Sequence, residues 1–116
     1  MSDLENTLKR ELKTIGLTED FNLCIRGYSK SFYGRYDPNT NTIVIYVLKN
    51  QRGEMFSFDE LMYTLIHEAI HCKQWHSPHF VRYKGVMHDS DFKFQYKKYT
   101  DIFRARKLMK EVKCSA

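Results

Sequence analysis

The sequence predicts a small α+β domain in which helices and a short β-sheet share one core. Apolar residues recur at helical spacing near the N-terminus and over two segments in the second half of the chain. Between them, residues 21–48 show the alternation and the β-branched residues that are typical of strands. A length of 116 residues suits one domain spanning 1–116.

Composition and charge limit the classes of protein to consider. The hydrophobic content of 42% is ordinary for a globular protein, which excludes a wholly disordered chain. There is no apolar run of roughly 20 residues and no basic, apolar N-terminal leader, so we expect an intracellular monomer with no membrane contact. The three cysteines are widely spaced and form no CxxC pair, which favours free thiols.

The first predicted element is an amphipathic helix over residues 3–15. Its apolar face consists of Leu4, Leu8, Leu12 and Ile15. Gly16 follows directly and is a typical helix stop, because glycine adopts the left-handed conformation that closes a helix end.

Residues 21–48 predict about three strands in a short antiparallel or mixed sheet. The run 31–36 and the run 42–48 flank turn residues at 37–41, so we expect them to form a hairpin. The run 43–48 is almost wholly apolar, which predicts a central strand covered on both faces. We expect this strand, or a neighbouring sheet edge, to bind an extended peptide by strand addition.

A second helix is predicted to begin after Ser57 and to continue to about Trp75. Ser57 and Glu60 fit a capping box, in which each residue satisfies a backbone N–H of the other. One face of this helix is predicted to enter the core: Leu61, Leu65, Ile66, Ala69 and Cys72. Ser77-Pro78 is expected to end the helix.

A last helix is predicted from a cap at Asp89 or Ser90 to about Val112. Its predicted apolar stripe consists of Phe92, Tyr96, Tyr99, Phe103 and Met109. The connection over 77–89 carries two further histidines, His79 and His88.

The second helix carries the chemistry, in the motif His67-Glu68-Ala69-Ile70-His71. Residues four apart lie on one face of a helix, one turn from each other, so both imidazoles can bind one metal ion. The glutamate after the first histidine lies close enough to act as a general base on the water that the metal activates. The motif therefore predicts a zinc hydrolase with His67 and His71 as ligands and Glu68 as the base.

A catalytic zinc ion takes three protein ligands, so the motif needs one more. The metzincin pattern is excluded, because Gln74 and Ser77 stand where it requires glycine and histidine. The remaining candidates are His76, His79, His88 and Asp91. His88 is favoured, since the connection before it is long enough to return to the metal, but the others stay open on the residues alone.

The two histidine segments together resemble the SprT-like metallopeptidase domain of the Spartan group. The helix Thr64-Leu65-Ile66-His67-Glu68-Ala69-Ile70-His71 is similar to the "TL-HE-x-x-H" helix of that family. His88-Asp89-Ser90-Asp91-Phe92-Lys93 is similar to its "HG-x-x-F/W-K" segment, with Asp89 in place of the usual glycine. Gly34-Arg35-Tyr36 and Ile43-Val44-Ile45 are similar to its hairpin.

This resemblance, over roughly residues 4–105, implies a zincin-like fold and a zinc metalloendopeptidase. It implies His67, His71 and His88 as zinc ligands and Glu68 as the base. It also implies protein substrates that are bound or crosslinked to DNA. A tyrosine such as Tyr83 is a candidate donor to the oxyanion.

The net charge of +5 agrees with an acidic partner such as DNA. Basic side chains that would contact phosphates lie mainly on the last helix: Lys93, Lys97, Arg104, Lys107 and Lys110, with Arg35 and Lys49 elsewhere. A solvated helix face explains the same pattern of basic residues.

Two other functions stay open: a non-catalytic, zinc-containing domain that binds protein or nucleic acid, and hydrolysis of a bond other than the peptide bond.

Overall fold

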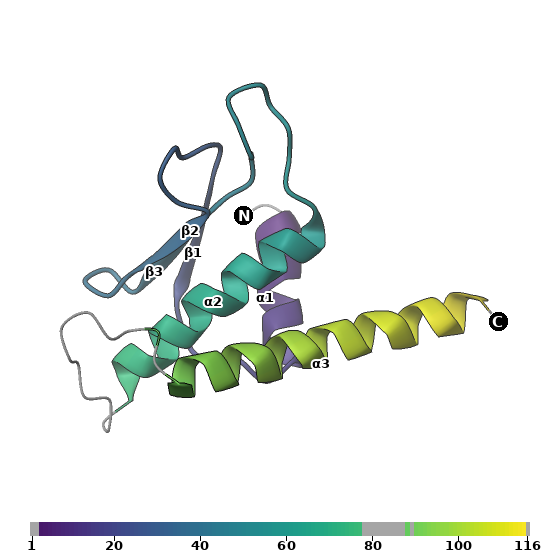
Figure 1. The fold of residues 1–116 in the computed structure, drawn as a ribbon. Helices are drawn as coiled ribbons and strands as arrows, with labels where there is room; N and C mark the ends of the chain where they lie inside the picture. Colours follow the sequence, from purple (N-terminus) through teal and green to yellow (C-terminus); the bar gives the residue numbers. More distant parts are fainter. Residues whose placement is uncertain (1–2, 78–87, 89, 116) are drawn as a thin grey trace.

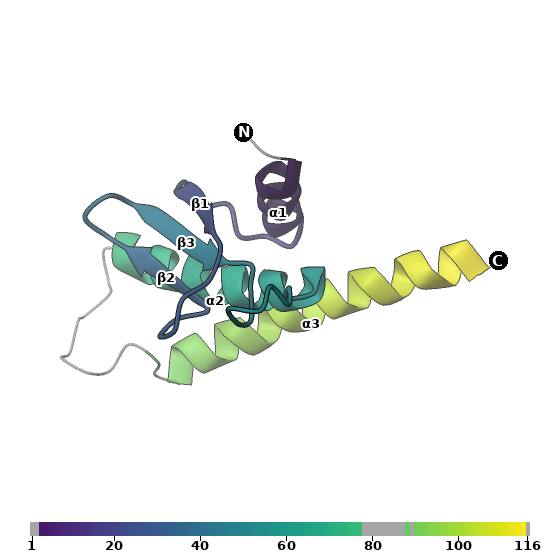
Figure 2. The ribbon, with the colours of Figure 1, turned by 90° about the horizontal axis from the view of Figure 1, so that it is seen from above.

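Helix α2 (Phe58–His76) lies at the centre of the fold, between a three-stranded sheet and helix α3 (Ser90–Ser115) (Figures 1 and 2). The computed structural model describes residues 3–77, 88 and 90–115, with side chains up to residue 110. The other elements are α1 (Asp3–Thr14), β1 (Asn22–Arg26), β2 (Gly34–Asp37) and β3 (Thr42–Tyr46). The predicted α+β class is confirmed. Among the described residues, no helix has the length and apolarity to cross a membrane.

Helix α1 ends as the sequence predicts. The amide of Gly16 donates to the carbonyl of Lys13, and the amide of Leu17 donates to that of Leu12, while Gly16 has a φ of 108°. This pair of bonds is a Schellman motif, which requires the left-handed conformation that glycine adopts without steric cost. The helix packs its buried leucines, Leu8 and Leu12, into the core beside α2.

The sheet is mixed, with the strand order β1-β3-β2. β2 and β3 form the predicted antiparallel hairpin, and β1 pairs with β3 in parallel. Strand β3 is central, and its consecutive residues Ile43, Val44 and Ile45 are all buried, so the prediction of a strand covered on both faces is confirmed. The expectation that β3 itself receives a substrate strand is wrong, because both of its edges are already paired. β2 is the sheet edge nearest α2.

Helix α2 begins at the predicted capping box. The Ser57 hydroxyl accepts from the amide of Glu60, and the Glu60 carboxylate accepts from the amide of Ser57. All five residues of its predicted core face are buried: Leu61, Leu65, Ile66, Ala69 and Cys72. Such a cap and such a buried face hold the helix that carries the HExxH motif in one position.

Helix α3 packs against α2 over its first half and extends beyond it toward the C-terminus (Figure 1). Phe92, Tyr99 and Phe103 of its predicted apolar stripe are buried. Met109 was predicted in the same stripe but is 62% exposed, because six residues after Phe103 correspond to a helix rotation of about 240°, which turns this side chain away from the stripe. The predicted connection, apart from Ser77 and His88, and the alternative cap Asp89 lie outside the described residues.

Candidate metal centre

Three imidazole rings meet at one point between α2 and the start of α3. The Nε2 atom of His71 lies 3.3 Å from that of His67 and 3.0 Å from that of His88, and the Nε2 atoms of His67 and His88 are 3.1 Å apart. His67 and His71 are one turn apart on α2, and His88 lies two residues before α3. Among the described residues, these three form the cluster with metal-ligand geometry.

The donor set and its spacing fit a zinc ion. Three nitrogens on a tetrahedral zinc ion, each about 2.05 Å from it, lie about 3.3 Å from one another. The observed separations of 3.0–3.3 Å are close to this value. Three imidazole nitrogens directed at one another cannot all be satisfied by mutual hydrogen bonds, since each neutral ring has one acceptor and one donor nitrogen. A shared cation satisfies all three lone pairs.

Phe92 packs against all three rings. Its centroid lies 4.9 Å from that of His67, 4.7 Å from that of His71 and 4.8 Å from that of His88, and it is stacked on His71 at 25°. Burial, and then the charges of the other two histidines, lower the pKa of His67 to about 4. Burial is also the main cause that lowers the pKa of His71. Both rings are therefore neutral near pH 7, which is the form that binds a metal.

The second nitrogen of His71 has a fixed partner on the same helix. The Nδ1 atom lies 3.1 Å from Oε1 of Gln74, and both residues are buried, with exposures of 7% and 5%. An amide oxygen only accepts, so Nδ1 carries the proton and the lone pair of Nε2 faces the cluster. In the sequence, Gln74 served only to exclude a metzincin. Its position three residues after His71, on the same helix face, was the signal for this contact.

Glu68 is buried between α2 and the edge strand β2, with 8% of its surface exposed. Burial raises the pKa of its carboxyl to about 7, and a hydrogen bond from the backbone N–H of Tyr36 on β2 acts in the opposite direction. Its Oε2 lies 3.9 Å from Nε2 of His67. A carboxyl that gains and loses a proton near neutrality, next to a metal cluster, suits general acid–base chemistry.

Gly34 allows β2 to approach α2 this closely. A Cβ atom at this position would lie 2.6 Å from Cγ2 of Thr64 and 3.0 Å from the carbonyl oxygen of Val44. It would also lie 3.6 Å from Cγ of Glu68. Because Gly34 has no side chain, the edge strand β2 can lie next to Glu68, the predicted base.

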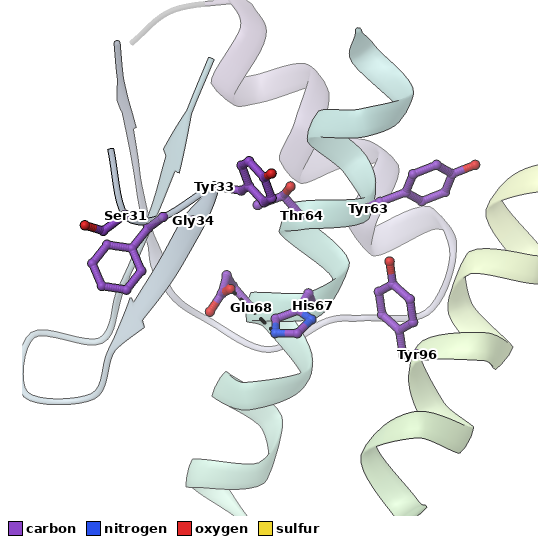
Figure 3. Close-up of a pocket in the computed structure, with 9 residues that line it drawn as sticks. Ser31, Tyr33, Gly34, Tyr63, Thr64, His67, Glu68 and Tyr96 are labelled. Atoms are coloured by element: carbon purple, nitrogen blue, oxygen red, sulfur yellow. Dashed lines mark ion pairs between the residues drawn. The ribbon is translucent and has the colours of Figure 1, made fainter. Parts of the chain in front are cut away.

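A pocket of about 310 Å³ opens beside His67 and Glu68 (Figure 3). It lies between β2 with its preceding loop on one side and helices α2 and α3 on the other. Its lining residues are Ser31, Phe32, Tyr33, Gly34, Tyr63, Thr64, His67, Glu68 and Tyr96. This pocket was not predicted from the sequence, because its residues come from three separate segments.

The other ligand candidates fall into two groups. His76 lies at the end of α2, where its Nδ1 is 3.5 Å from the sulfur of Cys72, and Asp91 accepts a hydrogen bond from the side-chain amide of Gln95. Neither belongs to the histidine cluster. His79, and Tyr83 as a candidate oxyanion donor, lie outside the described residues.

Two solved structures have a similar fold. One is the crystal structure of the metallopeptidase zymogen of Pyrococcus abyssi abylysin, with a TM-score of 0.55 and 20% identity over 92% of this chain and 93% of that chain. The other is that of the metallopeptidase zymogen of Methanocaldococcus jannaschii jannalysin, with a TM-score of 0.57 and 20% identity over 95% and 98%. The chain shares the fold of these metallopeptidases. Neither a protein-family model nor a curated protein matches the sequence.

Most basic residues of α3 that were predicted to contact DNA have carboxylate partners. Lys97 and Arg104 pair with Asp101, Lys107 pairs with Asp59, and Lys110 pairs with Glu11. These lysines and arginines are at least about half exposed, as a solvated helix face would be. Contact with DNA remains a prediction.

Proposed function

We propose that this protein is a zinc-dependent metalloendopeptidase of the SprT-like type, with His67, His71 and His88 as zinc ligands and Glu68 as general base. The observation that carries the proposal is the convergence of three Nε2 atoms at 3.0–3.3 Å beside a buried carboxylate and an open pocket. The fold shared with two metallopeptidases supports it.

The proposed mechanism assigns a task to each of these residues. When bound, zinc polarises both a water molecule and the carbonyl of the scissile bond. Glu68 takes a proton from the attacking water and passes it to the leaving amine. The backbone N–H of Tyr36 orients Glu68 for this step. An extended substrate would lie along the outer edge of β2, which places its main chain next to the base.

Glu68 also argues against a non-catalytic domain. A site that only stabilises the fold needs no buried carboxylate with a pKa near neutrality, since burying a charged group is costly. No specific observation favours a bond other than the peptide bond or a substrate linked to DNA, so the proposal stops at peptide hydrolysis.

Cleavage of unfolded protein should depend on zinc. We expect the purified chain to cut a denatured protein such as casein, to lose this activity in excess chelator and to regain it when Zn²⁺ is restored. Gel analysis and mass spectrometry of the fragments measure the outcome, with and without single-stranded DNA. Absence of cleavage under all of these conditions contradicts the proposal. Cleavage only with DNA would support the DNA-associated substrates that the resemblance implies.

His88→Ala should abolish the stabilisation that zinc gives to the fold. A ligand at 100 times its Kd raises the free energy of unfolding by about 2.7 kcal/mol. We expect this increase in the wild type and in the control His76→Ala, whose histidine lies outside the cluster. In His88→Ala, most of this zinc-dependent increase in the free energy of unfolding should be lost. Thermal unfolding at a fixed excess of zinc measures the rise in melting temperature that zinc causes. The same rise in His88→Ala as in the wild type excludes this residue as a ligand.

Gln74→Leu should weaken zinc binding without disturbing the ligands themselves. Leucine leaves the Nδ1–H of His71 buried without an acceptor, and loss of such an outer partner typically lowers metal affinity 10–100-fold. Gln74→Glu keeps an acceptor oxygen and should retain the wild-type affinity. Competition with a chromophoric chelator measures both variants. If Gln74→Leu and Gln74→Glu lose zinc affinity equally, Gln74 acts through packing alone.

A further inference from the structure

We propose that the pocket beside His67 and Glu68 binds one large, neutral, apolar side chain of the substrate, next to the bond that is cleaved. This inference rests on the proposed function and specifies the substrates that the site prefers. It comes from the aromatic walls of the pocket, from how those walls are held and from the cost of placing a charged side chain there.

Four aromatic side chains line the pocket: Phe32, Tyr33, Tyr63 and Tyr96. Phe32 is 53% exposed and Tyr33 is 71% exposed, both in the loop that precedes β2. These two exposed rings are neighbours and lie at one pocket that borders a candidate active site, whereas single exposed apolar residues elsewhere are ordinary. Burying them against a bound side chain removes apolar surface from water.

The walls are held before a substrate arrives. Tyr33 packs edge-on against Phe56 at 5.5 Å, and Tyr63 packs edge-on against Phe103 at 5.9 Å. Tyr96 lies parallel to Phe92, with ring centres 6.3 Å apart and an angle of 7°. Because three of the four rings are already packed, little side-chain entropy is lost on binding.

Charge disfavours a substrate side chain of either sign. Glu68 lines the pocket beside His67 (Figure 3), and its carboxylate repels an acidic side chain. Arg104 lies behind Tyr63, donating from Nε to the tyrosine oxygen at 3.2 Å, with its guanidinium 5.3 Å from the ring centre. Arg104 pairs with Asp101 and lies outside the lining; a lysine or arginine side chain is instead disfavoured because it would lose its hydration among aromatic rings. A neutral side chain meets neither penalty.

The size of the pocket fits this assignment. Its volume of about 310 Å³ is at the lower end for ligand sites, which suits a side chain and its adjoining main chain better than a larger group. The edge strand β2 borders the pocket through Gly34, so a peptide lying along β2 would direct one side chain into it.

Cleavage-site profiling tests the inference. The zinc-loaded protein is incubated with a peptide library from a digested proteome, and the residues around each cut are counted by mass spectrometry. We expect Phe, Tyr, Leu and Met to be enriched about tenfold over Lys and Asp at one fixed position next to the cut. Cleavage without a preference at any position, or with a preference for charged residues, overturns the inference and leaves the proposed function standing.

Two matched variants locate the preference in this pocket. Phe32→Ser removes one wall and should reduce the enrichment severalfold. Phe94→Ser is the control, because Phe94 is also exposed, at 70%, but lies on α3 outside the pocket lining. Equal profiles for the two variants, with the wild-type preference intact in both, place the recognition elsewhere and contradict the inference.

A binding measurement decides the case in which no peptide is cut. Zinc-loaded Glu68→Gln protein is titrated with acetyl-Ala-Phe-Ala-Ala-amide and with its Lys and Asp counterparts, and the backbone amide signals of Gly34 and Thr64 are followed by NMR. We expect the Phe peptide to shift these signals at the lowest concentration. Equal shifts, or tighter binding of a charged peptide, overturn the inference independently of any activity.

Discussion

Replacing Glu68 by Gln is expected to lower the rate of peptide cleavage by at least about 10²–10⁴-fold, the usual contribution of a general base. Glutamine has nearly the same shape, keeps the contact with Gly34 and still accepts from the N–H of Tyr36. It has no carboxylate to take the proton from water. Turnover of a fluorogenic casein substrate at saturating zinc measures the loss.

The variant is informative only if zinc binding survives. Glu68 is not one of the three cluster residues, so the zinc affinity of Glu68→Gln should stay within a fewfold of the wild type. Glu54→Gln is the matched control, since this carboxylate is exposed, pairs with Arg52 and lies outside both the cluster and the pocket lining. Full activity in zinc-loaded Glu68→Gln would remove the base from the mechanism and favour a non-catalytic domain.

Replacing Gly34 by Ala is expected to destabilise the fold by about 1–3 kcal/mol, as overpacking of a close contact does. The new methyl group would lie 2.6 Å from Cγ2 of Thr64 and 3.0 Å from a backbone oxygen, and a backbone oxygen cannot rotate away. β2 must then move away from α2. This movement also takes the backbone N–H of Tyr36 away from the carboxyl of Glu68. Urea unfolding in the presence of chelator measures the stability without a contribution from metal.

Two further variants separate this clash from a general effect of alanine. Gly27→Ala should be nearly neutral, because its Cβ would meet only Cδ1 of Leu48 at 3.7 Å. Thr64→Ser removes the methyl group that clashes, so it should recover part of the stability of Gly34→Ala. A double-mutant cycle gives the coupling between the two positions. Zero coupling would mean that β2 and α2 are not in the contact described.

The helix that carries the motif could be predicted almost completely from the sequence. Ser57 and Glu60 mark its start, and the spacing of His67 and His71 places two imidazoles on one face whatever the rest of the fold does. His88 was harder, because its position depends on a connection whose course has no local periodicity. The length of the connection favoured His88 but left other candidates open, and the family resemblance pointed to the same residue, which lies in the cluster.

Features that depend on neighbouring strands and helices escaped prediction. The apolar run at 43–48 indicates a central strand, but which flanking strand forms the edge beside α2 depends on sheet order, which sequence does not encode locally. The aromatic pocket combines side chains from a loop, α2 and α3. Met109 was assigned to the apolar stripe, but the six residues from Phe103 turn the helix by about 240°, which directs Met109 away from the stripe and explains its exposure.

The positions of His71 and His88 also have a consequence for folding. They are 17 residues apart in the chain, and a shared ion would join them as a cross-link. Closing a loop of about this length costs about 3 kcal/mol of chain entropy, and the binding free energy of the ion would offset this cost as the chain folds. Zinc would thereby fasten the beginning of α3 to α2, with Phe92 enclosed by the three rings. Under the proposed function, removal of the ion would therefore loosen the start of α3 as well as remove the activity.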